Sequence, residues 1–153
     1  MQVNYQGNRD AKTVLLQIIG EHELPFIEDE LSHIKATTHI TDFLFVTVQV
    51  DIWNDDLSPW PSAPIFGEAA FAGNAEKLLT RIKNEVIIPL SSVSPDIKIF
   101  SGGYSLAGLF VLWSGYQTNL FEGIAAVSPS VWFPGFVDFV HNNKILTNRV
   151  YLS

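Results

Sequence analysis

The sequence predicts an α/β fold built as a three-layer sandwich, with helices on both faces of a mainly parallel five-stranded sheet. Two observations support this prediction. Apolar runs of strand length alternate with segments whose apolar residues recur at helical spacing. The strand-like runs are apolar at almost every position, which is typical of strands covered on both faces. The strand–helix unit occurs four times and is followed by a fifth strand.

Each element has its own signal in the chain. The strands are expected at residues 13–19, 43–50, 97–100, 123–127 and 149–152. The first helix is opened by Pro25, and the second begins after Asn74, a residue suited to an N-cap, and ends at Pro89. The third helix, 106–115, is apolar on most faces and should be buried. A short fourth helix is expected around 136–141, and residues 1–12 form a lead-in or edge segment.

The order of the strands in space follows from right-handed crossovers. If the third strand lies beside the first, on the side away from the second, the order is 2-1-3-4-5. This order creates a switch point between the first and third strands, where ligands bind in open α/β sheets. The loop after the first strand and the turn after the third strand would meet there.

Two segments are expected to be ordered loops. Residues 51–73 carry two tryptophans and several prolines, and loops longer than about 12 to 15 residues in a compact domain are usually functional or disordered. The tryptophans argue against disorder. The second loop spans residues 128–135.

Length and composition set limits on the class of protein. With 153 residues, 47% of them hydrophobic, the chain is expected to form one domain, residues 1–153, with a substantial core. No apolar run approaches the roughly 20 residues that cross a bilayer, so no membrane association is expected. The N-terminus lacks the pattern of a signal peptide, which makes a cytoplasmic location the default.

Residue usage also excludes several chemistries. The absence of cysteine excludes disulfides, thiolate catalysis and cysteine-bound metals. Four dispersed histidines show no metal-ligand spacing, so neither a metal nor another cofactor is expected. A net charge of -7 with nine scattered Lys and Arg residues argues against binding nucleic acid.

The turn between the third strand and the third helix has the pattern of a nucleophile elbow. In this turn a serine sits on a strained backbone between strand and helix, and the residues two before and two after it are small. Gly103 and Ala107 flank Ser105 in this way, with alanine where glycine is usual. We therefore predict that Ser105 is a nucleophile. The alternative is that it caps the helix or binds an anion at the helix N-terminus.

A serine nucleophile needs preorganised donors for the oxyanion that develops on its substrate. We expect the backbone N–H of Leu106 and one N–H from the Gly20-Glu21 turn to form this oxyanion hole. The substrate would be bound by His22 and four aromatic residues: Trp53, Trp60, Tyr104 and Trp132. Trp132 could instead belong to the core.

The general base is the open question. In hydrolases with this elbow the acid and the histidine follow the serine along the chain. His141 alone follows Ser105, and its place at the end of a predicted helix is typical of a surface residue. Asp138 in the same helix is more typical of a solvated side chain than of a triad acid. His22 precedes the serine and is placed to line the site, and the alternative is an ordinary loop histidine.

Four segments resemble a known family: residues 15–20, 53–61, 103–108 and 121–132. The last includes Ser128-Pro129-Ser130-Val131-Trp132, which is distinctive. From about Val14 onward the chain resembles the α/β-hydrolase superfamily, and within it the esterases related to esterase D and enterochelin esterase. The resemblance implies a serine esterase or thioesterase that forms an acyl-enzyme at Ser105 on a small-molecule ester. Its strands would be the third to seventh of the usual eight.

The resemblance would place the acid after the strand that starts at Arg149, and the histidine further on, both beyond Ser153. Three explanations follow: a C-terminally truncated chain, a site completed by a partner subunit, or a noncatalytic binding module of α/β-hydrolase type. We favour truncation, because a strand that stops at an apolar edge is normally covered or paired. The same open edge suggests a homodimer.

Overall fold

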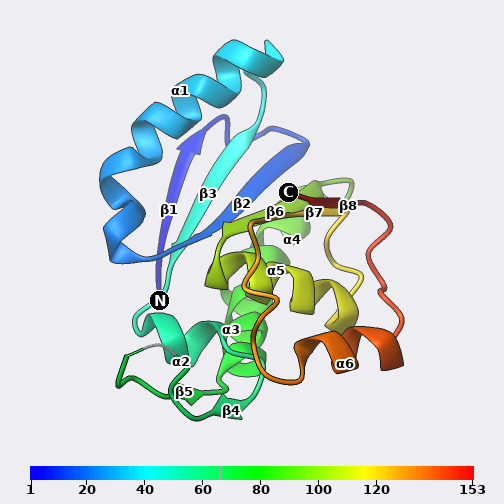
Figure 1. Cartoon of the computed structure of the whole chain (residues 1–153). Coiled ribbons are helices and arrows are strands. Elements are labelled where there is room, and N and C mark those ends of the chain that lie inside the picture. Colours follow the sequence, from blue (N-terminus) through cyan, green and yellow to red (C-terminus); the bar gives the residue numbers. More distant parts are fainter. Residues whose placement is uncertain (66) are drawn as a thin grey trace.

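A six-stranded sheet forms the centre of the molecule (Figure 1). The computed structural model describes residues 1–65 and 67–153. The strands lie in the order β1-β3-β2-β6-β7-β8. Five of them are parallel, and β1 is antiparallel to its neighbour β3. Their bounds are β1 (Gln2–Gly7), β2 (Thr13–Ile19), β3 (Leu44–Gln49), β6 (Lys98–Tyr104), β7 (Gly123–Val127) and β8 (Val150–Leu152).

The α/β class and the predicted order of the five parallel strands are confirmed, but the strand count is corrected from five to six. The additional strand, β1, lies in the segment expected to be a lead-in or edge. Its residues are mostly exposed or half-buried, so it lacks the apolar run that marks the inner strands. Pairing with β3, not a hydrophobic pattern, defines this edge strand. Strand β6 also extends to Tyr104, past two glycines that hide its end in the sequence.

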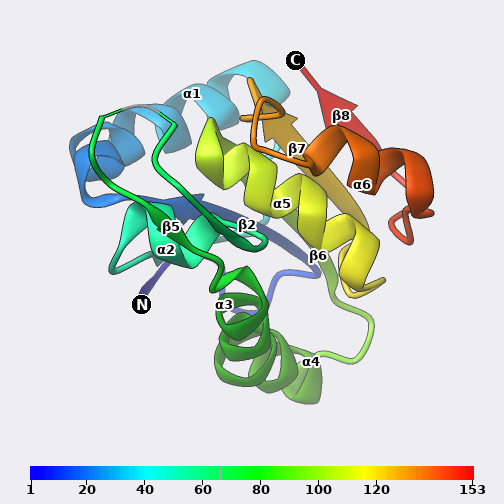
Figure 2. The ribbon, with the colours of Figure 1, turned by 60° about the horizontal axis from the view of Figure 1, so that its bottom comes forward.

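Helices cover both faces of the sheet, which gives the three predicted layers. On one face, α1 (Ile27–Thr38) packs its buried residues Ile27 and Leu31 with Phe45 of β3. The main core includes residues of α3, α5 and α6, which Figures 1 and 2 show on the opposite side of the sheet from α1. Their bounds are α3 (Ala75–Ile82), α5 (Leu106–Gln117) and α6 (Phe136–Asn142).

Helix α5 is the centre of the main core, as its apolar sequence predicts. Its residues from Leu106 to Gly115 are all buried. The helix packs on β6, the strand before the elbow, and on β7, the strand before the loop of residues 128–135. The position of its first turn is therefore determined by packing along almost its whole length.

Two predicted helices differ from their expected bounds. Pro25 lies in a 3-10 helix (η1, Glu21–Phe26) that precedes α1. The second helix does not end at Pro89, because α3 continues through a π-helical turn (η2, Lys83–Ile87) into α4 (Ile88–Val93). Pro89 occupies the first turn of α4, where its missing N–H costs little. Asn74 stands at the N-cap, but its side chain accepts a bond from Lys77 Nζ.

The segment 51–73, which the structure describes except for residue 66, contains secondary structure that the sequence does not predict. It contains a short helix, α2 (Trp53–Leu57), and a hairpin of β4 (Pro61–Ser62) and β5 (Phe71–Ala72). Carboxylates organise the turns, since Asp56 Oδ2 accepts bonds from two backbone N–H groups and Asp55 Oδ1 accepts the N–H of Ala72. Among the helices of the described residues, none has the length and apolar character needed to cross a membrane.

Candidate active site

The carboxyl ends of β2 and β6 lie side by side at the predicted switch point. These strands are parallel neighbours, and Ile18 of β2 is opposite Gly103 of β6. Because both strands end within two residues of this pair, the turn at Gly20 and the turn at Ser105 leave the sheet at the same edge. Ligands of open α/β sheets bind at such an edge.

The turn at Ser105 has the geometry of a nucleophile elbow. Ser105 has φ 56° and ψ -117°, a conformation that L-residues rarely adopt. A Cβ atom at Gly103 would lie 2.6 Å from the backbone carbon and oxygen of Ala107, so the crossing of strand and helix requires glycine there. Small residues on both sides and a strained serine between them are the features that the sequence pattern predicts.

The Ser105 side chain is half-buried at the start of α5. Its Oγ lies 3.4 Å from Oγ of Ser130, which belongs to the loop after β7. Its N–H donates to the carbonyl oxygen of Val127 at 3.0 Å. Leu106 supplies the first N–H group of the helix, and such N–H groups have no partner within the helix. The predicted nucleophile and this predicted oxyanion donor are thus adjacent.

The other side of the predicted oxyanion hole is arranged differently from our expectation. The N–H of Gly20 donates to Oε2 of Glu23 at 2.8 Å, and Glu21 opens the 3-10 helix η1. Burial raises the pKa of the Glu23 carboxyl, and the bond from Gly20 opposes this rise in part. In this conformation Glu23 engages the donor that we expected Gly20 to offer to a substrate.

No histidine forms a hydrogen bond with Ser105 in the part of the chain that the structure describes. His22 has 64% of its side chain exposed, and its ring contacts Trp53 edge-on with the centroids 4.8 Å apart. Its Nε2 lies 3.8 Å from Oε2 of Glu23. His141 is exposed at the end of α6, as expected of a surface residue. In the described residues, Ser105 Oγ therefore has a serine, and no histidine, as its hydrogen-bond partner.

Two of the predicted substrate-binding aromatic residues, Trp60 and Trp132, lie in different environments. Trp60 donates its Nε1–H to the carbonyl oxygen of Pro134 at 2.8 Å and packs against the rings of Phe133, Phe136 and Phe139. Trp60 therefore joins the segment 51–73 to the loop after β7 and to α6. Trp132 remains 46% exposed with its ring near Phe71, so it lies at the surface and not in the core.

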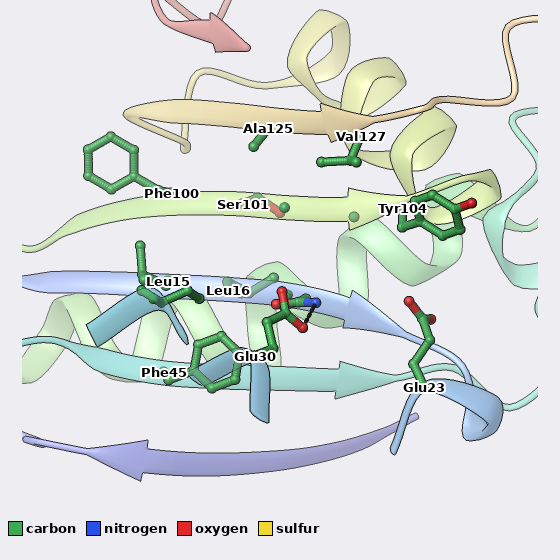
Figure 3. A pocket seen from close by; sticks show the side chains of 14 residues that line it. Leu15, Leu16, Glu23, Glu30, Phe45, Phe100, Ser101, Tyr104, Ala125 and Val127 are labelled. Carbon is green, nitrogen blue, oxygen red and sulfur yellow. Dashed lines mark hydrogen bonds between the residues drawn. The ribbon is translucent and has the colours of Figure 1, made fainter. Parts of the chain in front are cut away.

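A cavity of about 430 Å³ lies on the α1 side of the sheet, next to the elbow (Figure 3). Its walls come from β2, β3, β6, β7, α1 and η1, and Tyr104 and Glu23 lie at the end nearest the switch point. Gln17 Nε2 donates to Glu30 Oε2 within it. Tyr104, 54% exposed, borders this cavity, whereas Ser105 does not. The cavity is thus separate from the nucleophile.

Sequence reasoning missed two residues of this region. The sequence singles out Ser130 only as part of a Ser-Pro-Ser-x-Trp segment. Its loop follows the strand next to β6 and therefore leaves the sheet at the same edge. The sequence pattern does not single out Glu23. Its spacing of three residues from Gly20, at the start of a helical turn, is the signal of a carboxylate that binds back to a cap N–H.

Known proteins resemble this chain in structure but not in sequence. Neither a model of a protein family nor a curated protein matches the sequence. Solved structures do match. The siderophore hydrolase EstA from Aspergillus nidulans superposes with a TM-score of 0.66 over 90% of this chain, at 18% identity. The chain has the α/β-hydrolase fold.

Two further hydrolases show the same likeness. An IroE-like serine hydrolase from Shewanella oneidensis matches 88% of the chain with a TM-score of 0.66, and the enterobactin and salmochelin hydrolase IroE matches 93% with 0.65, each at 18% identity. The chain covers 54% of EstA, 46% of the Shewanella protein and 62% of IroE. It therefore spans about half the length of these structures, whose shared feature with it is the fold.

Proposed function

We propose that this chain carries the nucleophile of a serine hydrolase of the esterase type, with Ser105 as the attacking residue. One observation carries the proposal: Ser105 has a strained backbone, φ 56° and ψ -117°, at a crossing of strand and helix so close that Gly103 has no room for a Cβ atom. Backbone strain of this kind persists only where the surrounding structure enforces it, and it concentrates at functional sites.

The reaction would proceed through an acyl-enzyme. Ser105 Oγ attacks the ester carbonyl carbon, its proton passes to a base, and the alcohol leaves as the tetrahedral intermediate collapses. The N–H of Leu106 lies beside the serine at the helix N-terminus, which favours negative charge on the carbonyl oxygen. Water then attacks the acyl carbon and gives a proton to the base, and the carboxylic acid leaves as the base returns a proton to Ser105 Oγ.

The substrate class is suggested by the neighbours. Two of them are named as hydrolases of siderophores, enterobactin or salmochelin, so we propose a small-molecule ester and take siderophore esters as the first to assay. Exposed Tyr104 and Trp132 supply apolar area near the site for such a ligand. The alternative, a noncatalytic module with the same elbow, is not favoured by structural neighbours named as hydrolases.

Labelling of the 153-residue chain with a fluorophosphonate probe tests the proposal. The adduct is mapped by mass spectrometry, with Ser105→Ala as the control and circular dichroism to show that both chains are folded. We expect the probe on Ser105 in the wild type and its loss in the variant. A folded wild-type chain that stays unlabelled, or that is labelled equally after Ser105→Ala, would overturn the proposal for this chain.

A further inference from the structure

The loop after β7 is fastened to Ser105 through the backbone. The N–H of Ser105 donates to Val127 O at 3.0 Å, and the N–H of Ser130 donates back to Ser105 O at 3.1 Å. Between these two bonds, Ser128 has φ 42°, in the left-handed region, which turns the chain back over the elbow. The loop is therefore held at a fixed distance from the nucleophile.

Close packing of the loop on α5 reinforces these bonds. A Cβ atom at Gly108 would lie 3.0 Å from Val127 O and 3.2 Å from the Cα of Pro129. The N–H of Phe133 also donates to the carbonyl oxygen of Ser130 at 3.0 Å. Both the first turn of α5 and the loop would have to move before Ser130 could leave Ser105.

Ser130 places a buried hydroxyl group against the nucleophile. The residue is 2% exposed, and its Oγ has Ser105 Oγ as its hydrogen-bond partner at 3.4 Å. A hydroxyl group removed from water destabilises the folded state unless it forms a hydrogen bond. Ser130 is therefore better satisfied when its O–H points at Ser105.

We propose that Ser130 is a positioning residue for the nucleophile, an inference that rests on the proposed function. Its O–H donates to Ser105 Oγ, which fixes the rotation of the Ser105 side chain and leaves the Ser105 proton free for the base. The same bond strengthens as the Ser105 oxygen loses its proton, because hydrogen bonds to charged acceptors are stronger than those to neutral ones. Ser130 thereby orients the attacking oxygen and makes it easier to deprotonate.

The test measures the rate of fluorophosphonate labelling of Ser105 against pH for the wild type, Ser130→Ala and Ser130→Thr. We expect Ser130→Ala to slow labelling about tenfold and to move the rising part of the pH profile upward, since the deprotonated oxygen loses a donor. Ser130→Thr keeps the hydroxyl group and should restore most of the rate. If the added methyl group of Thr prevents folding, the pH shift in Ser130→Ala decides.

A double-mutant cycle in urea unfolding measures the bond itself. Ser105→Ala, Ser130→Ala and the double variant should show a coupling of about fivefold in the unfolding equilibrium constant. Absence of coupling would overturn the proposal. So would coupling with superimposed labelling profiles in wild type and Ser130→Ala, which would mark Ser130 as structural only.

The labelling results distinguish failure of the proposed hydrolase function from failure of the positioning role of Ser130. A wild-type chain that is folded and unlabelled contradicts the proposed function and removes the positioning role with it. A labelled wild type whose rate does not change in Ser130→Ala contradicts the role of Ser130 alone.

Discussion

The two faces of strand β6 differ in how tightly they are packed. On the α5 face, Ile99, Ser101 and Gly103 are buried, and Gly103 is in direct contact with Ala107. On the other face, Phe100 and Gly102 are half-buried, and they border the cavity of about 430 Å³. A single strand thus has one closely packed face and one face that remains open.

This difference shows which contacts form the elbow. The strain at Ser105 depends on the close crossing of β6 and α5, which lies entirely on the packed face. The open face contributes Tyr104 and the cavity, which Ser105 does not border. In the described residues, the Ser105 Oγ has Ser130 as its hydrogen-bond partner. The geometry of the nucleophile should therefore respond to changes on one face and tolerate changes on the other.

Phenylalanines on the two faces should give the largest difference. Phe110 of α5 is 1% exposed on the packed face, and Phe110→Ala should lower the free energy of unfolding by about 3–5 kcal/mol. Phe100 borders the cavity, so Phe100→Ala should cost about 1 kcal/mol. Urea unfolding of the two variants measures both values. Equal losses would show that the open face is packed in solution.

Two glycines in β6 provide a second matched pair. A Cβ atom at Gly103 would meet the Ala107 backbone at 2.6 Å, and Gly103→Ala should destabilise the fold by about 2–3 kcal/mol. At Gly102 the added atom meets only Ala125 O, at 3.8 Å, so Gly102→Ala should change stability by about 0.5 kcal/mol or less. The same denaturation measurement compares them, and similar values would contradict the close crossing at Gly103.

Strain at the elbow should be visible when Ser105 is replaced. Glycine adopts φ 56° without a steric penalty, whereas alanine keeps the Cβ atom that causes it. We expect Ser105→Gly to be more stable than Ser105→Ala by about 1 kcal/mol, measured by thermal or urea unfolding. Both variants lack the hydroxyl group, so the comparison isolates the backbone. A less stable glycine variant would argue against strain.

The smallest effect concerns pH and Glu23. The raised pKa of this carboxyl means that the folded state binds its proton more tightly than the unfolded state does, so stability falls as pH rises from about 4.5 through the folded pKa. Glu23→Gln keeps an acceptor for the Gly20 N–H and removes this loss. The variant should therefore gain stability relative to the wild type as pH rises above about 4.5. Unfolding curves whose difference is constant with pH would contradict the effect of burial.

The parts of the fold that the sequence predicts are those with a strong local signal. Continuous apolar runs at 13–19 and 43–50 identify inner strands, and small residues around Ser105 identify the elbow. Strand β1 and the hairpin in 51–73 are missed, because pairing and carboxylate bonds hold them and no apolar pattern marks them. The predicted helix end at Pro89 is wrong, because the π-helical turn places Pro89 in the first turn of α4, where proline is tolerated.

The site is predictable only to the level of the backbone. The pattern Gly103 to Ala107 specifies a turn, and the turn specifies where Ser105 lies. The bond between the Ser105 and Ser130 hydroxyl groups depends on the route of a loop 25 residues further along the chain, which local pattern does not contain. The bond from Gly20 to Glu23 depends likewise on the side-chain conformation of one glutamate.

Trapping of an acyl-enzyme tests the central claim most directly. The folded chain would be mixed with an excess of a p-nitrophenyl ester, quenched in acid and digested, and the peptide that contains Ser105 would be weighed by mass spectrometry. The account predicts the mass of the acyl group on Ser105, absent in Ser105→Ala. An unmodified Ser105 peptide in a folded chain, or ester cleavage that persists in Ser105→Ala, would contradict it.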